Sequence, residues 1–248
     1  MTAFAATIKA DTLSETLAPI SAIVDECKLH ATEDGLEICA VDPATVARAR
    51  VALDKTAFEA FDTTGVTLGV NLERLEDVLS MAEDELTLEL IDDTHKLRIE
   101  SDGLEYTLAL IDTDSIRQEP DIPDLDLPAT FVLDGGSISR GIKAADLVAK
   151  HITIAGDGET DSLILSAEGD TDDVTETLAG DRVTNADVGE SCESMFSLYY
   201  LKDISKPIGS SASVTLRFGD EFPLKMRYYG ADGPLTVTNM LAPRIQSD

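Results

Sequence analysis

Tryptophan is absent from this 248-residue chain, and aromatic residues make up only 5% of it. With so few aromatic side chains, we do not expect recognition of single-stranded nucleic acid by base stacking. Cysteine occurs three times, an odd number without CxxC spacing. This predicts buried free thiols and a reducing, cytoplasmic location rather than a disulfide framework. The three histidines lie far apart in the sequence, so we expect neither a metal site nor a cofactor.

Long apolar runs are also missing. No stretch approaches the 18 residues that a membrane-spanning helix needs. The first 19 residues are interrupted by Lys9, Asp11 and Glu15, so they do not resemble the apolar region of a signal peptide. We therefore expect no contact with a membrane.

Positive charge is scarce. Lys and Arg number 19, of which nine are Lys, against 48 Asp and Glu, and the formal net charge is −29. The acidic residues are spread along the chain rather than gathered in one tail. At about 1 M salt the Debye length falls to about 3 Å, which screens the repulsion that such a charge causes in dilute buffer. The composition is typical of a halophile, and its 43% of hydrophobic residues is enough to form a core.

The chain contains an internal repeat. When it is shifted by about 125 residues, the apolar positions of the first half fall on those of the second. The shift places residues 13, 17, 20 and 24 on 138, 142, 145 and 149, residues 71–78 on 197–204, and residues 86–90 on 214–218. Few of these residues are identical, so the repeat rests on periodicity and order. We predict that both halves have the same fold.

Each half is predicted to contain many strands and two short helices. Alternating apolar residues, for example over 86–90 and 106–110, predict half-buried strands. Apolar residues three and four apart predict helices, and the N-cap residues that we expect for them are Thr12, Asn71, Ser137 and Ser197. Pro19 should kink or loosen the first helix. The pattern predicts two α+β domains of one fold, residues 1–111 and 129–248.

Residues 112–128 separate these domains. They contain three prolines and six acidic residues without sustained periodicity, which predicts an extended linker.

Basic residues gather on the helices of the second half. On a helical wheel five of the 19 lie away from the apolar stripe or on its flank: Arg140, Lys143, Lys150, Lys202 and Lys206. The outer faces of the first-half helices carry one base, Arg74. A basic face on so acidic a chain indicates contact with a polyanion. The alternative is an ordinary solvated surface.

Catalytic motifs are missing from the sequence. It has no phosphate-binding glycine loop, no HExxH and no nucleophile elbow. Among 48 carboxylates, a pair that looks like a general acid and base occurs by chance. We therefore expect a protein that is not an enzyme.

In order and over nearly its whole length, the chain resembles the archaeal and eukaryotic sliding clamps of the proliferating cell nuclear antigen (PCNA) family, and its acidity resembles that of a haloarchaeal member. The segments that carry the resemblance are 41–46, 69–72, 122–123, 196–201, 222–224 and 241–245. The resemblance implies an α+β subunit of two similar clamp domains, with residues 112–128 as the interdomain connecting loop. It also implies a homotrimeric ring around double-stranded DNA.

The function implied by this resemblance is that of a DNA sliding clamp, a processivity factor in DNA replication and DNA repair. Its partners would be the replicative DNA polymerase, the clamp loader, flap endonuclease and DNA ligase, bound through a short peptide motif. The alternatives are an enzyme on a duplicated α+β scaffold and a peptide-binding scaffold that does not encircle DNA.

The resemblance and the helical wheel together give three sets of site residues. The DNA-facing set is Arg140, Lys143, Lys150, Lys202, Lys206 and Arg74. The peptide-binding set is Val41, Thr45, Val46, Ile122, Pro123, Leu125, Pro223, Met240, Leu241, Ala242 and Pro243. The subunit-interface set, on two expected edge strands, is Tyr106, Leu108, Leu110, Val174 and Leu178. Each apolar member of the peptide-binding set could instead be plain core. The DNA-facing set is poor in charge for this family, so we expect topology rather than affinity to hold the ring on DNA.

Overall fold

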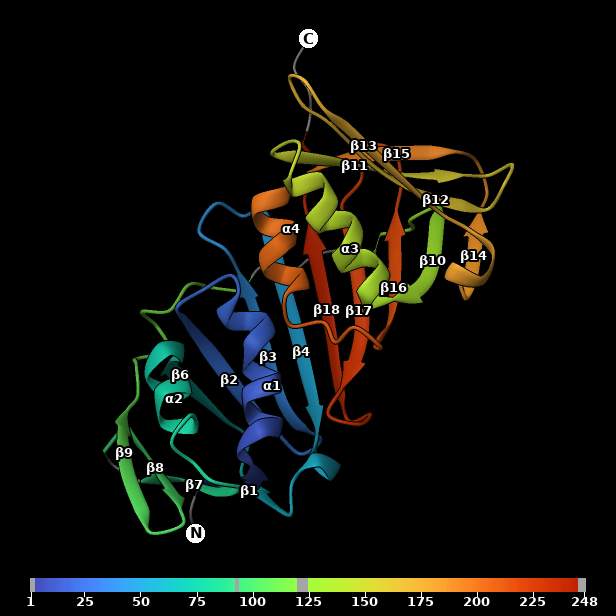
Figure 1. Cartoon of the computed structure of the whole chain (residues 1–248). Coiled ribbons are helices and arrows are strands. Elements are labelled where there is room, and N and C mark those ends of the chain that lie inside the picture. Colours follow the sequence, from blue (N-terminus) through green and yellow to red (C-terminus); the bar gives the residue numbers. More distant parts are fainter. Residues whose placement is uncertain (1–2, 92–93, 120–124, 245–248) are drawn as a thin grey trace. The chain divides into compact units, whose positions relative to one another are not determined.

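The structure is a computed structural model that describes residues 3–91, 94–119 and 125–244. No helix within these ranges is long and apolar enough to cross a membrane. The chain forms two compact units, each of which is described by itself (Figure 1). Unit 1 contains the elements of the first half and unit 2 those of the second, except that strands β4, β17 and β18 contribute residues to both units.

The elements of the first half are β1 (Phe4–Lys9), α1 (Ala10–Ser21), β2 (Glu26–Thr32), β3 (Gly35–Val41), β4 (Ala47–Asp54), the 3₁₀ turn η1 (Lys55–Ala57), β5 (Ala60–Thr63), β6 (Val66–Asn71), α2 (Leu72–Leu79), β7 (Glu85–Ile91), β8 (Lys96–Ser101) and β9 (Leu104–Ala109). Those of the second half are β10 (Ala129–Asp134), α3 (Gly135–Asp146), β11 (His151–Asp157), β12 (Ser162–Glu168), β13 (Asp173–Leu178), the 3₁₀ turn η2 (Gly180–Arg182), β14 (Asn185–Val188), β15 (Cys192–Ser197), α4 (Leu198–Ser205), β16 (Ser213–Phe218), β17 (Leu224–Gly230) and β18 (Leu235–Leu241). The order of elements is the same in both halves, and strands outnumber helices. The predicted α+β class is therefore confirmed.

Strand pairing repeats along with element order. The first strand of each half pairs antiparallel with the fifth and the seventh, as β1 does with β5 and β7, and β10 with β14 and β16. The second strand pairs with the third and the sixth, as β2 does with β3 and β6, and β11 with β12 and β15. β9 ends a five-stranded sheet, β5-β1-β7-β8-β9, and β13 ends a four-stranded sheet, β13-β12-β11-β15. Both predicted edge strands are thus sheet edges within the described chain.

The helices are also duplicated. Ala10 and Gly135, the first residues of α1 and α3, are 125 residues apart, and so are their last residues. Helix α1 packs beside α2 in unit 1, and α3 beside α4 in unit 2 (Figure 1). Their apolar stripes are buried, as predicted: Leu13, Leu17, Ile20, Leu72, Leu75, Val78, Ile138, Ile142, Ala145, Leu198, Leu201 and Ile204. Val24 and Ala149, which we expected at the ends of these stripes, lie beyond the helices. Helix α1 runs through Pro19 to Ser21, so this proline does not end it.

Two of the four expected N-caps, Asn71 and Ser197, are confirmed in position, and the other two are wrong. Asn71 caps α2, because its side chain accepts the Arg74 amide at 2.9 Å. Ser197 has the N-cap position of α4 but makes no capping hydrogen bond with its side chain. Helices α1 and α3 begin earlier than predicted, so Thr12 and Ser137 lie inside them.

Helices α1 and α3 begin without a side-chain cap because backbone carbonyls from other segments accept hydrogen bonds from their first amides. The amide of Ala10 donates to Asp84 O at 2.7 Å, and that of Gly135 donates to Ala212 O at 2.9 Å. The close approach also explains the glycine, because a Cβ on Gly135 would lie 2.4 Å from Gly209 O. Donors at a helix start need an acceptor, which need not be a side chain.

Candidate functional site

The basic residues of the second-half helices lie on the surface. Ile138 and Ile142 turn one side of α3 into the core of unit 2, which leaves Arg140 and Lys143 exposed on the other side. On α4 the same arrangement exposes Lys202, and Lys206 is exposed as its C-cap residue. Lys150 is exposed as well, but it follows the end of α3, so its predicted place on that helix is wrong.

Two of these cations form ion pairs with carboxylates that are distant in sequence. Arg140 Nη2 donates to Glu176 Oε1 on β13. Lys202 Nζ lies 2.7 Å from Asp146 Oδ2 at the end of α3. For Lys143, Lys150 and Lys206, no carboxylate within the described ranges lies closer than 4 Å.

Apolar side chains accompany the cations on α3 and α4, which the sequence analysis did not single out. Leu147, next to Asp146, is 88% exposed, and Tyr199 on α4 is 71% exposed. Tyr199 also meets the ring of Tyr200 edge to face at 5.1 Å. A three- and four-residue spacing puts Tyr199 on one side of α4 with Lys202 and Lys206. This pattern was visible in the sequence as an apolar residue off the buried stripe.

The outer face of α2 differs from that of α3. Arg74 is exposed there, between exposed Glu73 and exposed Asp77 on the same helix. The surface of unit 1 helices is thus not basic, in agreement with the helical wheel.

The predicted peptide-binding set divides into exposed and core residues. In unit 2 the Ala242 amide donates to Val46 O at 2.8 Å, so these two members lie together. Thr45 is exposed, whereas Val46, Leu125, Pro223, Met240, Ala242 and Pro243 are half-buried.

Two members of the peptide-binding set are core residues. Val41 and Leu241 are 7% and 0% exposed, so their side chains are buried within the fold. Leu127, in the predicted linker, is core as well, at 2% exposure. Ile122 and Pro123 lie outside the described residues.

The turn before β4 has a strained backbone. Thr45 has a φ of 61°, which a β-branched side chain rarely adopts. Such strain persists only where the surroundings impose it, and it is concentrated at functional positions. In unit 1 the buried Asp42 follows β3, and its carbonyl accepts a hydrogen bond from the Arg117 guanidinium at 2.9 Å.

The start of the predicted linker is fixed to unit 1. Ile111 donates its amide to Gly69 O at 2.8 Å, and a Cβ on Gly69 would lie 2.2 Å from Ile111 O. Ile116 is buried at 5% exposure. His30 on β2 then bridges Thr67 Oγ1, at 3.0 Å, and Glu119 Oε1, at 3.2 Å. Sequence reasoning placed this stretch in an extended linker and did not find these anchors.

Four of the five predicted interface residues lie on the two edge strands and Leu110 directly follows β9, with mixed exposure. Tyr106 on β9 is 36% exposed, and Leu110 and Val174 are half-buried. Leu108 and Leu178 are 1% and 0% exposed, so the side chain of each belongs to the core of its own unit and only its backbone is available to a pairing of edge strands. Alternation along a strand explains the difference, since neighbouring side chains point to opposite faces.

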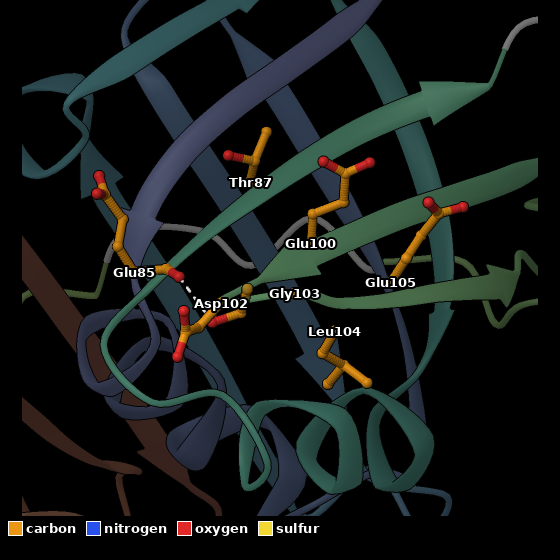
Figure 2. Close-up of a pocket in the computed structure, with 8 residues that line it drawn as sticks. Glu85, Thr87, Glu100, Asp102, Gly103, Leu104 and Glu105 are labelled. Carbon is orange, nitrogen blue, oxygen red and sulfur yellow. Dashed lines mark hydrogen bonds between the residues drawn. The ribbon is translucent and has the colours of Figure 1, made fainter.

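An open, acidic hollow of about 400 Å³ lies at the β8–β9 turn. Figure 2 shows Glu85, Glu100, Asp102 and Glu105 around it. A hydrogen bond with Glu59 raises the pKa of Glu85. Within the described ranges no group of three or more His, Cys, Asp or Glu side chains is placed to hold a metal ion. The hollow therefore adds no metal site to the arrangement.

Comparison with known proteins extends over the whole chain. The family model for the N-terminal domain of proliferating cell nuclear antigen matches residues 4–116. The DNA polymerase sliding clamp of Halobacterium salinarum is 53% identical over 247 residues, 99% of this chain and 100% of that protein. That of Haloarcula marismortui is 51% identical over the same shares. The solved structure of A. fulgidus PCNA with the C-terminal region of FEN-1 bound is 32% identical, with a TM-score of 0.92 over 99% of this chain and 100% of that one.

These likenesses confirm the resemblance expected from the sequence, because they cover both halves and the segment between them. The chain belongs to the PCNA family of DNA polymerase sliding clamps.

Proposed function

We propose that three copies of this chain close into a ring around duplex DNA and that the ring tethers replication and repair enzymes to it without catalysing a reaction. The observation that carries the proposal is the duplication of the strand pairing, which leaves β9 and β13 at sheet edges. Exposed edge strands invite pairing with another chain, and proteins that leave them bare risk aggregation.

The pairing of copies follows from the repeat. Strands β4 and β18 are bonded at both ends, by Asp54 N to Pro234 O at 3.0 Å in unit 1 and by Ala242 N to Val46 O in unit 2. In the repeat, β13 is the counterpart of β4 and β9 the counterpart of β18. We propose that β13 of one copy pairs with β9 of the next in the same manner. Backbone hydrogen bonds would carry this contact, with Tyr106, Leu110 and Val174 beside them.

We assign contact with DNA to the exposed bases Arg140, Lys143, Lys150, Lys202 and Lys206, with Arg74 as a minor contributor. These residues form a cluster of positive charge on a chain whose net charge is −29, and positive charge is what a phosphate backbone binds. A closed ring is held on DNA by its topology, so these contacts can be weak.

We assign partner peptides to the surface formed by Thr45, Val46, Ala242 and the half-buried residues near them in sequence. Partly exposed apolar side chains around a strained turn suit the insertion of apolar anchors from a peptide. The A. fulgidus protein in the solved relative carries the C-terminal region of FEN-1. For this chain we propose the tails of DNA polymerase, clamp loader, flap endonuclease and DNA ligase.

Two measurements in high salt test the proposal. Light scattering in 2 M KCl should give a mass of three times 26.6 kDa. Primer extension by a polymerase of a related halophile should yield longer products when the chain and its loader are added to a circular template. A monomeric mass together with unchanged product length would refute it.

A further inference from the structure

Glu176 is an unusual carboxylate for this surface. Its side chain is only 12% exposed, while every other carboxylate in an ion pair of the described chain is between 28% and 107% exposed. Two guanidinium groups reach its Oε1, Arg140 Nη2 from α3 and Arg182 Nη1 at 3.4 Å from η2. Its Oε2 lies 3.4 Å from the point where Gly141 would carry a Cβ, so the carboxylate rests against α3. Glu176 is therefore built into the helix surface.

Asp146 forms a second ion pair of this kind at the C-terminal end of α3. It is the last residue of the helix, where a negative charge opposes the helix dipole. Lys202 Nζ from α4 lies 2.7 Å from its Oδ2 and offsets that charge. Of the five exposed bases of unit 2 that we assign to DNA, Arg140 and Lys202 thus have a carboxylate from another element, and the other three have none in the described ranges.

We propose that Glu176 and Asp146 withhold the charges of Arg140 and Lys202 from DNA, and thereby keep the affinity of the clamp for duplex low enough to slide. The proposal rests on the proposed function. A cation must leave its carboxylate before it can neutralise a phosphate, so a paired cation contributes less to binding than a free one. Each phosphate that is neutralised adds about 0.9 to the steepness of log K against log[salt]. Each such contact also has to break when the ring moves along DNA.

The two pairs differ in degree. Glu176 is shared between Arg140 and Arg182, so it neutralises Arg140 only in part. Within the described ranges Asp146 pairs with Lys202 alone. Lys143, Lys150 and Lys206 should then dominate the electrostatic contact of the wild-type protein.

Glu176→Gln and Asp146→Asn test the inference. Both substitutions keep the size of the side chain and a hydrogen-bond acceptor, so they remove the charge without removing the contact. The affinity of the intact trimer for a fluorescent linear duplex is measured by anisotropy from 1 to 3 M KCl, where we expect the trimer to be stable. We expect each variant to bind about two- to fivefold more tightly, the range of one exposed charge interaction. The salt dependence should steepen by about 0.9 for each cation released to a phosphate.

The matched control is Glu168→Gln at the exposed end of β12. It changes the net charge of unit 2 by the same amount, and no base in the described ranges lies within 4 Å of Glu168. Its salt dependence should equal that of the wild-type protein. Light scattering checks that each variant is still a trimer. If Glu176→Gln disturbs the edge strand and loses the trimer, Asp146→Asn, which lies on a helix, decides the question.

The inference is overturned if Glu176→Gln and Asp146→Asn behave like Glu168→Gln while Lys143→Ala and Lys206→Ala weaken binding. In that case the clamp function still stands. If neither lysine variant changes binding and the wild-type protein does not stimulate a polymerase, the proposed function itself fails.

Discussion

Two cysteine residues are held in their unreactive thiol form. Burial, together with the charges of Glu119 and Glu26, raises the pKa of the Cys27 thiol to about 12. Burial also raises the pKa of Cys192. A thiol is nucleophilic only as the thiolate, so neither residue is a reactive site in the folded protein.

We expect Cys27 and Cys192 to resist alkylation in the native protein. At pH 8 about one Cys27 side chain in ten thousand is a thiolate. Iodoacetamide in 2 M KCl, followed by mass spectrometry of peptides, should leave both cysteines unmodified until denaturant is added. Rapid native labelling of Cys27 would contradict the assigned burial.

The same thiol predicts a loss of stability in alkali. An unfolded cysteine ionises near pH 8.5, while the folded Cys27 stays neutral to about pH 12. Because its folded pKa is raised, the stability that it contributes is complete below about pH 8.5 and declines as the pH rises toward 12. Urea midpoints measured from pH 7 to 10 should fall above pH 8.5, and Cys27→Ser should reduce that fall.

The peptide surface can be tested at one position. Ala242 is half-buried, and its amide binds Val46 O, so a larger charged side chain would occupy the proposed contact surface without removing a core residue. Ala242→Glu should weaken a polymerase tail peptide at least tenfold in calorimetric titration, as expected for an interface position. Light scattering should still show the trimer, since Ala242 lies on neither edge strand. Wild-type peptide affinity would remove the assignment.

At the scale of elements, periodicity predicted more than local rules did. The 125-residue repeat and the buried helix stripes follow from apolar spacing, which burial dictates directly. The expected caps at Thr12 and Ser137 failed because the acceptors are carbonyls of Asp84 and Ala212, far away along the chain. For the same reason a helical wheel found the exposed bases but not their partners: Arg140 and Glu176 are 36 residues apart, and Lys202 and Asp146 are 56 apart. Pairings at such distances leave no local pattern.

The contribution of α3 and α4 to DNA contact can be tested by reversing the charge of their exposed lysines. Lys143→Glu together with Lys206→Glu should lower clamp-stimulated synthesis several-fold, because both residues are exposed and unpaired in the described ranges. The paired control is Lys55→Glu on η1 with a second exposed lysine of unit 1, Lys9→Glu. Equal activity of the two double variants would mean that the basic helix faces are dispensable.

The contact between β6 and the predicted linker leaves no space for a side chain at Gly69. A Cβ on Gly69 would lie 2.2 Å from Ile111 O and 2.9 Å from the buried Ile116, so the segments must separate to accept it. We expect Gly69→Ala to lower the free energy of unfolding by about 1–3 kcal/mol, as overpacking does. Gly189→Ala, which meets no atom within 4 Å, should cost much less. Urea unfolding followed by circular dichroism separates the two.

At the scale of the whole molecule, the net negative charge determines the salt concentration at which we expect a folded trimer. Each copy carries a formal charge of −29, and assembly brings copies together. The Debye length grows from about 3 Å at 1 M to about 10 Å at 0.1 M, so repulsion that is screened in high salt acts across the subunit at low salt.

We therefore expect the trimer to dissociate, or the chain to unfold, as KCl falls below about 1 M. Light scattering and circular dichroism in parallel over 0.1 to 3 M KCl distinguish the two events. An intact, folded trimer at 0.1 M would show that apolar burial and strand pairing are sufficient without screening.

The helix starts also determine how the chain acquires its fold. The first amide of α1, that of Ala10, donates to the carbonyl of Asp84, and the first amide of α3, that of Gly135, donates to the carbonyl of Ala212. Such separations give a high contact order, and chains of that kind fold slowly. During synthesis the first amide of each helix cannot meet its carbonyl acceptor until most of its half has left the ribosome. We therefore expect the amides of Ala10 and Gly135 to exchange with solvent only when the whole half unfolds.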